Sequence, residues 1–302
     1  CLQYVLEEGN KKDWLDDTYI LILSILVVLG FICLIIRELT FSSPIVDLGA
    51  FRNINFSFGC IYSFILGVGL YGAVYLLPLF LFSVAGFNTL QIGITMIVTG
   101  LCQLCSAPLA AKVFDSGLDK RIMLAIGYLT FGLGCYLNSF LTADSRFWEL
   151  CLPQMVRGIA LMFCFMPIND LALGTMSKDQ VQNASGLYNL TRNLGGAIGL
   201  AFINSLIISK SKIFAQAMRD NMAFTSPLVR EQLDFFTRIL QGKVDNPKLA
   251  AYTLLDNTIN QQAFIIAINN IFIIIALMFC LSTLLLPFTS TVDNDRSGLG
   301  GH

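Results

Sequence analysis

The feature that most constrains this chain is a long stretch without charge. No Asp, Glu, Lys or Arg occurs from Asn53 to Ala111, and only a polar turn, Gly86-Phe87-Asn88-Thr89-Leu90-Gln91, interrupts the apolar residues. A helix rises about 1.5 Å per residue, so roughly 20 apolar residues cross a hydrocarbon core about 30 Å thick. The stretch therefore predicts two transmembrane helices joined by a tight turn.

The composition extends this prediction to the whole chain. Hydrophobic residues make up 55% of it and charged residues 13%, which is typical of an all-α integral membrane protein. A net charge of -1 provides no basic surface for nucleic acid. The single histidine, His302, argues against a Ser-His-Asp hydrolase, a His-ligated zinc site or a haem site. We therefore predict no catalytic residues, no metal site and no cofactor.

Seven segments are long and apolar enough to span a bilayer. They are Thr18–Ile36, Phe56–Phe82, Thr89–Ala111, Ile122–Leu141, Leu150–Leu171, Gly186–Ile208 and Phe264–Leu286. Basic residues are enriched in the connections after the first, third and fifth segments, which predicts that these connections are cytoplasmic. Counting the long connection 209–263 reverses this bias.

The long connection contains a helical pattern of its own. Val229, Leu233, Phe236 and Leu240 recur at helical spacing, with charged residues off that stripe. The pattern predicts an amphipathic helix that lies on the membrane surface or caps the bundle. An ordinary exposed loop helix is the alternative.

Three stretches resemble EmrB/QacA-type drug exporters, which are fourteen-helix members of the major facilitator superfamily. Residues 2–9, LQYVLEEG, followed by residues 13–15, DWL, resemble the external segment before the eighth helix of that family. Residues 153–158, PQMVRG, continuing to 165–167, FMP, resemble its twelfth helix. Residues 184–199, ASGLYNLTRNLGGAIG, resemble the signature that opens its thirteenth helix.

This resemblance implies one linker transmembrane helix followed by a six-helix C-terminal transporter domain. The implied parts are 1–52 (external segment, linker helix and cytoplasmic connection), 53–290 (six-helix domain, with 209–263 as a long extracytoplasmic connection) and 291–302 (polar cytoplasmic tail). An N-terminal half, with the principal proton-titrating carboxylates, is then missing. Residues 112–121 keep only Asp115 and the final basic pair of the superfamily's G-x-x-x-D-R-x-G-[RK] loop, which puts the inter-domain latch of this half in doubt.

The implied function is proton-coupled efflux of hydrophobic or cationic drugs across the bacterial cytoplasmic (inner) membrane by alternating access. Alternatives are export of a specific metabolite such as a siderophore, and a non-transporting truncated remnant. An intramembrane enzyme is disfavoured because two of the three charged residues at membrane depth are arginines, which do not act as bases. The implied partners are the lipid bilayer, a small hydrophobic substrate, the missing N-terminal half, and a periplasmic adaptor with an outer-membrane channel.

Arg157 is the first candidate for substrate binding or coupling. It lies on the order of 10 Å below the outer face, and Gln154 precedes it on the same helical face. Because an arginine at this depth is costly, it faces a wet cavity or a partner. We predict that Arg157 lines the central cavity and senses the charge of the substrate or of the coupling ion. A structural arginine that reaches the interface or helix-end carbonyls is the alternative.

Two further sets of residues lie at the fifth and sixth segments. Asp170 and Arg192 are equally far in sequence from the middle of the connection, which predicts a gating ion pair near the cytoplasmic face. Separate contacts of each residue with interfacial water are the alternative. Gly195, Gly196 and Gly199 form a small-residue patch that predicts close helix packing, with a direct substrate contact as the alternative.

A cavity for drugs requires apolar and aromatic walls with few polar anchors. The candidates for these walls and anchors are Tyr71, Tyr75, Phe80, Gln103, Phe163 and Asn169. Gln103 is foremost because an amide buried at mid-membrane needs a hydrogen-bond partner.

Overall fold

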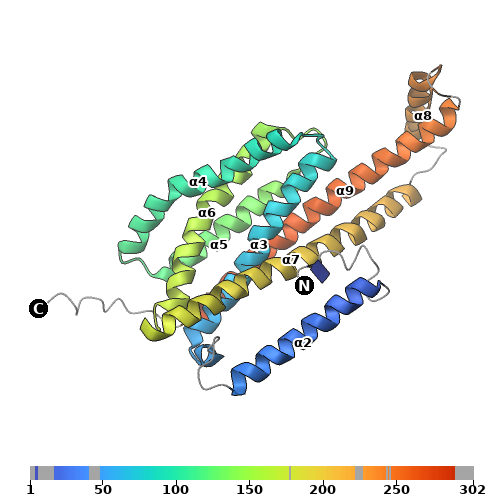
Figure 1. The fold of residues 1–302 in the computed structure, drawn as a ribbon. Helices are drawn as coiled ribbons and strands as arrows, with labels where there is room; N and C mark the ends of the chain where they lie inside the picture. The colour runs from blue at the N-terminus through green and yellow to red at the C-terminus, as the bar shows by residue number, and fades with distance from the viewer. Residues whose placement is uncertain are drawn as a thin grey trace, which may run out of the picture.

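The computed structural model describes residues 4–5, 17–40, 48–176, 178–221, 227–242, 244 and 246–289, and these residues contain no strand (Figure 1). The α-helices in chain order are α2 (Thr18–Thr40), α3 (Ile54–Ser83), α4 (Thr89–Asp115), α5 (Lys120–Leu137), α6 (Phe147–Leu173), α7 (Lys178–Asn221), α8 (Pro227–Leu240) and α9 (Pro247–Ser282). Short 3-10 helices are η2 (Leu48–Arg52), η3 (Asn138–Phe140) and η4 (Thr283–Phe288). The predictions for the external segment and for the polar tail fall outside the described residues.

The helical segments confirm the all-α class. Six of the described helices, α3 to α7 and α9, are long and apolar enough to cross a membrane. Each overlaps one of the predicted segments, although the segment Ile122–Leu141 extends beyond α5 through η3 and the segment Phe264–Leu286 extends beyond α9 into η4. The remaining prediction falls on α2, which is apolar over the shorter length Thr18–Cys33. Most described side chains of α2 are exposed, whereas the six long helices pack into one bundle.

The polar turn within the uncharged stretch ends one helix and starts the next. Gly86 has a φ of 67°, a left-handed conformation that glycine adopts without strain. Asn88 then caps α4, since its Oδ1 accepts from the amide of Gln91 at 2.9 Å and Gln91 Oε1 accepts from the amide of Asn88 at 2.9 Å. This capping box satisfies amides at the start of α4 that have no partner within the helix.

α3 forms the centre of the bundle and packs against α6, α7 and α9. α4 packs on α6, and α5 packs on both α6 and α9 (Figure 1). Between α3, α5 and α9, Phe131 stacks on Phe279 with ring centroids 4.4 Å apart, and Tyr62 meets Tyr128 edge to face at 5.4 Å. These aromatic contacts fix the three helices together. α4 and α7 are the least buried of the six spans and lie on opposite sides of α3 and α6 (Figure 1).

The predicted small-residue patch lies where α7 meets α3. A Cβ added at Gly195 would meet the carbonyl oxygen of Phe64. A Cβ at Gly196 would meet the ring of Tyr71, and Gly199 also faces α3. Glycines at these positions therefore allow the two backbones to approach closely, as small residues do between helices in lipid.

The described residues of segment 209–263 extend the bundle at one end, and we call them the arm (Figure 1). α7 has 44 residues, so it is about 66 Å long and continues well past the predicted end of its span. α8 carries the predicted amphipathic stripe, but that stripe packs on α7 and α9. The arm therefore has its own small core, formed by Ala215, Val229, Leu255, Ile259 and Ala263. The expected cap over the bundle is not observed, because α8 packs on α9 within the arm; the position of α8 on the membrane surface stays a prediction.

Polar contacts also join the two long helices of the arm. Arg219 of α7 donates to Asp256 Oδ1 at 2.9 Å through Nε and to Asn260 Oδ1 at 2.8 Å through Nη2. The side chains of Arg219 and Asp256 are 38% and 49% exposed, so this ion pair stabilises the arm only weakly. The apolar contacts with α8 are thus the main source of the arm's stability.

Candidate functional site

Arg157 lies in α6 and is buried between α4 and α5, with 2% of its surface exposed. Its Nη2 donates to Oε1 of Gln154, one turn earlier on the same face. The hydroxyl of Thr99 in α4 donates to the same oxygen, so Gln154 connects α6 to α4. On the other side, Gly134 of α5 makes room for the arginine, because a Cβ there would lie 2.5 Å from Arg157 Cγ.

The guanidinium is buried where α6 meets α5, and the role of Arg157 in a central cavity stays a prediction. Its one hydrogen-bond partner is a neutral amide, and its Nη1 is buried without a partner among the described residues. A buried charge whose one described partner is a neutral amide carries a desolvation cost.

Gln103 was predicted to be buried at mid-membrane, and it is half-buried on α4. Its backbone amide faces Gly158 of α6, where an added Cβ would lie 3.2 Å from the nitrogen. Its backbone carbonyl accepts from the Ser106 hydroxyl at 2.9 Å. Gln103 was the foremost anchor candidate because a buried amide needs a hydrogen-bond partner. Its side chain is only half-buried, so this reason is weaker than expected.

Asp170 forms an ion pair, but its partner is Lys120 and not Arg192. Lys120 Nζ, at the start of α5, lies 2.5 Å from Asp170 Oδ2 near the end of α6, and each side chain is 17% exposed. The same Nζ lies 5.0 Å from the centre of the Phe114 ring. The predicted pair with Arg192 is therefore not formed in this structure, because the carboxylate of Asp170 turns toward the α4–α5 connection.

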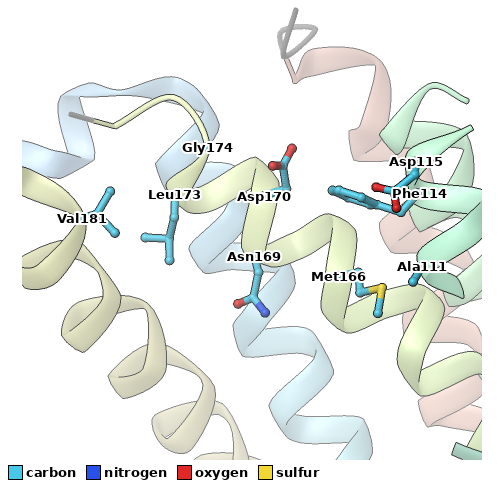
Figure 2. A pocket seen from close by; sticks show the side chains of 9 residues that line it. All are labelled: Ala111, Phe114, Asp115, Met166, Asn169, Asp170, Leu173, Gly174 and Val181. Carbon is cyan, nitrogen blue, oxygen red and sulfur yellow. The ribbon is translucent and has the colours of Figure 1, made fainter. Parts of the chain in front are cut away.

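A cavity of about 530 Å³ opens beside this ion pair, at the predicted cytoplasmic end of the bundle (Figure 2). It is lined by Ala111, Phe114, Asp115, Met166, Asn169, Asp170, Leu173, Gly174 and Val181. These residues come from α4, from α6 with its C-terminal cap, and from the start of α7, so two consecutive helices and the more distant α4 form the walls. The lining is mostly apolar, and Asn169 contributes an exposed amide to it.

Arg192 lies on α7 between two aromatic rings. Its Cζ is 5.1 Å from the centre of the Phe165 ring on α6 and 5.0 Å from that of Tyr188, one turn earlier on α7. Its Nη2 donates to Asn189 Oδ1 at 2.6 Å. Its Nε has no partner among the described residues. The guanidinium thus bridges α7 to α6 by cation–π contacts and retains unused hydrogen-bond donors.

Further polar contacts join α3 and α7 along the same side of the bundle. The hydroxyl of Tyr71, a side chain that is 38% exposed, donates to Asn193 Oδ1 at 3.2 Å. The hydroxyl of Tyr75 donates to Asn204 Oδ1 at 3.4 Å. Of the remaining aromatic candidates, Phe80 is fully buried in the core and Phe163 is half-buried.

Several residues of these clusters were not identified from the sequence. Asn189 and Asn193 lie within one turn of Arg192, so helical spacing alone indicates that they are its neighbours. Lys120 and Thr99 are different, because their contacts depend on how separate helices pack. As for metal binding, the described part of the chain contains no group of three or more His, Cys, Asp or Glu side chains close enough to hold an ion.

These features define a class of protein. Six helices of membrane-spanning length form one bundle, the charges within it are few, and a mostly apolar cavity opens at one end. This architecture is that of a multi-pass membrane protein of the transporter type. Residues 17–200 match the model of the Major Facilitator Superfamily, and the chain therefore belongs to that superfamily.

Similar proteins narrow the family further. The chain is 34% identical to the colistin resistance protein EmrB of Acinetobacter baumannii, over 95% of this chain and 56% of that protein. It is 28% identical to the multidrug export protein EmrB of Haemophilus influenzae, over 92% of this chain and 54% of that protein. It is also 28% identical to the fatty acid resistance protein FarB of Neisseria gonorrhoeae, over 100% of this chain and 58% of that protein.

These relatives place the chain in the EmrB-type branch of the superfamily, which confirms the family predicted from the sequence. The relatives are transporters and not enzymes, and the chain is a multi-pass protein of the bacterial inner membrane. The chain spans about half the length of the curated relatives that it matches.

Proposed function

We propose that this chain is the C-terminal half of an exporter that moves hydrophobic or cationic drugs out across the inner membrane by proton-coupled alternating access. Relatives named as multidrug export and colistin resistance proteins support the general activity of drug efflux. The N-terminal half supplies the rest of the translocation pathway. A periplasmic adaptor and an outer-membrane channel receive the substrate, and the arm is the part of this chain that extends toward them.

The cavity between α4, α6 and α7 is the observation that carries this proposal. Its volume of about 530 Å³ lies within the roughly 300–1,000 Å³ range of sites for small molecules. Its walls are mostly apolar with few polar groups, which suits hydrophobic compounds of varied shape. Its position between three separate helices allows it to open or close when these helices move.

Proton coupling is assigned to the N-terminal half. Asp170 is an acidic residue of α6 that lines the cavity, and Lys120 holds it in an ion pair. The carboxylate of Asp170 thus serves to compensate the charge of Lys120 within the bundle. One proton that moves down a 100 mV potential releases about 2.3 kcal/mol, which is sufficient to drive accumulation against a gradient.

Efflux from cells tests the proposal. The full-length gene would be expressed in a strain that lacks its own drug pumps, and the loss of a preloaded hydrophobic cationic dye would be followed by fluorescence. Efflux that stops when nigericin collapses the pH gradient is the expected result. Efflux that continues would contradict coupling to the pH gradient. No efflux of any dye from a well-expressed protein would favour a specific metabolite exporter or a remnant without transport.

A further inference from the structure

Arg157 carries a buried charge that no acidic side chain among the described residues neutralises. Its side chain is 2% exposed, and its Nη2 donates to the neutral amide of Gln154. The nearest acidic residues along α6 are Glu149 and Asp170, roughly 12 Å and 20 Å away along the helix axis. Glu149 is exposed, and Asp170 is paired with Lys120. Because a buried charge is costly unless an opposite charge compensates it, Arg157 is a candidate for binding an anion.

Asn138 follows α5 directly and lies next to this charge. It is fully buried, and neither its Nδ2 nor its Oδ1 has a hydrogen-bond partner among the described residues. Its backbone amide donates to the carbonyl of Gly134, so Asn138 lies one turn beyond the glycine that packs against Arg157 Cγ. Helical side chains lean toward the N-terminus of their helix, and α6 runs antiparallel to α5. The guanidinium therefore extends toward Asn138, in the direction that its hydrogen bond to Gln154 also shows.

The chain just beyond Asn138 is held by α9 and leads to the surface. Nδ2 of Asn269 donates to the carbonyl of Leu141 at 2.8 Å, and η3 packs on α9. Thr142 and Asp144 follow and are exposed. The fold thus fixes the position of Asn138, and a small ion can reach it from the predicted outer end of the bundle.

The polar atoms at this contact favour an anion over a water molecule or a cation. Arg157 Nη1 is buried without a partner among the described residues, and it provides both hydrogen-bond donors and a positive charge. Asn138 Nδ2 is a second donor. A water molecule would accept these hydrogen bonds but would leave the charge uncompensated, and a cation would be repelled by it. Because both side chains are buried, the ligand is a single small ion and not an organic molecule.

We propose that Arg157 and Asn138 bind a chloride ion at the contact of α5 with α6, near the predicted outer end of the bundle. The guanidinium compensates the charge of the ion, and the amide of Asn138 donates a second hydrogen bond to it from the other helix. The ion neutralises the arginine and joins α5 to α6 as a buried ion pair would. Chloride here is a structural ligand and not a substrate, so this site goes beyond the proposed exporter function and does not depend on it.

Thermal unfolding of the full-length protein in detergent micelles tests this proposal without any transport step. Chloride replaces gluconate at constant sodium concentration and ionic strength, and unfolding is followed by scanning calorimetry. An ion that binds only the folded state raises Tm with the logarithm of its concentration, so we expect about 1–3 °C for each tenfold increase above the dissociation constant. Bromide should act like chloride. The same Tm in gluconate, chloride and bromide would overturn the proposal.

Variants locate the ion. Arg157→Gln removes the charge and should have the same Tm in chloride and in gluconate. Asn138→Leu removes one hydrogen bond to the ion, so the chloride concentration at which Tm begins to rise should increase by about tenfold. Arg192→Gln changes an arginine on α7 and is the matched control, which should keep the response of the wild type. A chloride response that persists in Arg157→Gln would place the ion elsewhere and contradict the proposal.

Crystals of the wild-type protein soaked in bromide provide a measurement that does not depend on whether Arg157→Gln folds. Anomalous scattering from bromide beside Arg157 Nη1, between α5 and α6, is the expected result. Ordered water alone at that position would overturn the proposal, because it would show that the arginine is hydrated and not neutralised.

Discussion

The ion pair between Lys120 and Asp170 provides a direct test of the structure. Sequence position favoured a pair between Asp170 and Arg192, whereas the structure places Lys120 Nζ 2.5 Å from Asp170 Oδ2. The perturbations are Asp170→Asn and Lys120→Met, alone and together. A parallel double-mutant cycle combines Asp170→Asn with Arg192→Gln.

The expected magnitude follows from the geometry and burial of the pair. Opposite charges about 4 Å apart attract each other by roughly 4 kcal/mol at an effective dielectric constant of about 20, before desolvation is subtracted. Each side chain is 17% exposed, so water and salt screen the pair only in part. We expect an interaction free energy of about 1–3 kcal/mol between Asp170 and Lys120, and a value within about 0.5 kcal/mol of zero between Asp170 and Arg192.

The measurement is the free energy of unfolding of the full-length protein in mixed micelles, followed by far-ultraviolet circular dichroism as a denaturing detergent is added. The interaction free energy is the difference between the double variant and the sum of the two single variants. A larger interaction free energy with Arg192 than with Lys120 would refute the reasoning. It would show that the matching positions of Asp170 and Arg192 along α6 and α7, and not the position of the α4–α5 connection, decide the partner of Asp170.

Three further predictions concern packing. Gly195→Ala should lower the free energy of unfolding by about 1–3 kcal/mol, because its Cβ would overlap a backbone carbonyl of α3. Gly186→Ala, with open space around it, should change this free energy little, and equal effects of the two variants would argue against close packing of α3 and α7. Gln154→Leu leaves the buried Arg157 without its acceptor and should lower the free energy of unfolding by about 1–3 kcal/mol. Gln103→Leu, at a half-buried position, should lower it by less than about 1 kcal/mol, and the reverse order of the two effects would contradict this account. Ile259→Ala should lower the free energy of local unfolding of the arm by about 2–4 kcal/mol, so that hydrogen exchange becomes faster in α8 but not in the bundle. An equal increase of the exchange rate in the arm and in the bundle would mean that the arm does not have a separate core.

The sequence determined the spans because the property that defines them is local. A run of apolar residues long enough to cross the bilayer forms a helix whatever its neighbours are, since lipid offers no other partner for the backbone. The turn over residues 86–91 is equally local and appears where the residues predict it, with Gly86 in a left-handed conformation and Asn88 as the cap of α4. The shared face of Gln154 and Arg157 follows from helical spacing alone, and the hydrogen bond between them is present.

Only the tertiary structure decided which helices meet and which faces they bury. Arg157 is buried because α5 packs beside it, with Gly134 against its Cγ. Asp170 bonds to Lys120, fifty residues away, because α5 starts beside the end of α6. α8 could be recognised as amphipathic, but the surface that receives its apolar stripe exists only because α7 and α9 continue beyond the bundle. Hydropathy and helical spacing fix what each helix is, because they act within one segment. The environment of each charge is set by packing between segments, and periodicity in a single sequence carries no record of that packing.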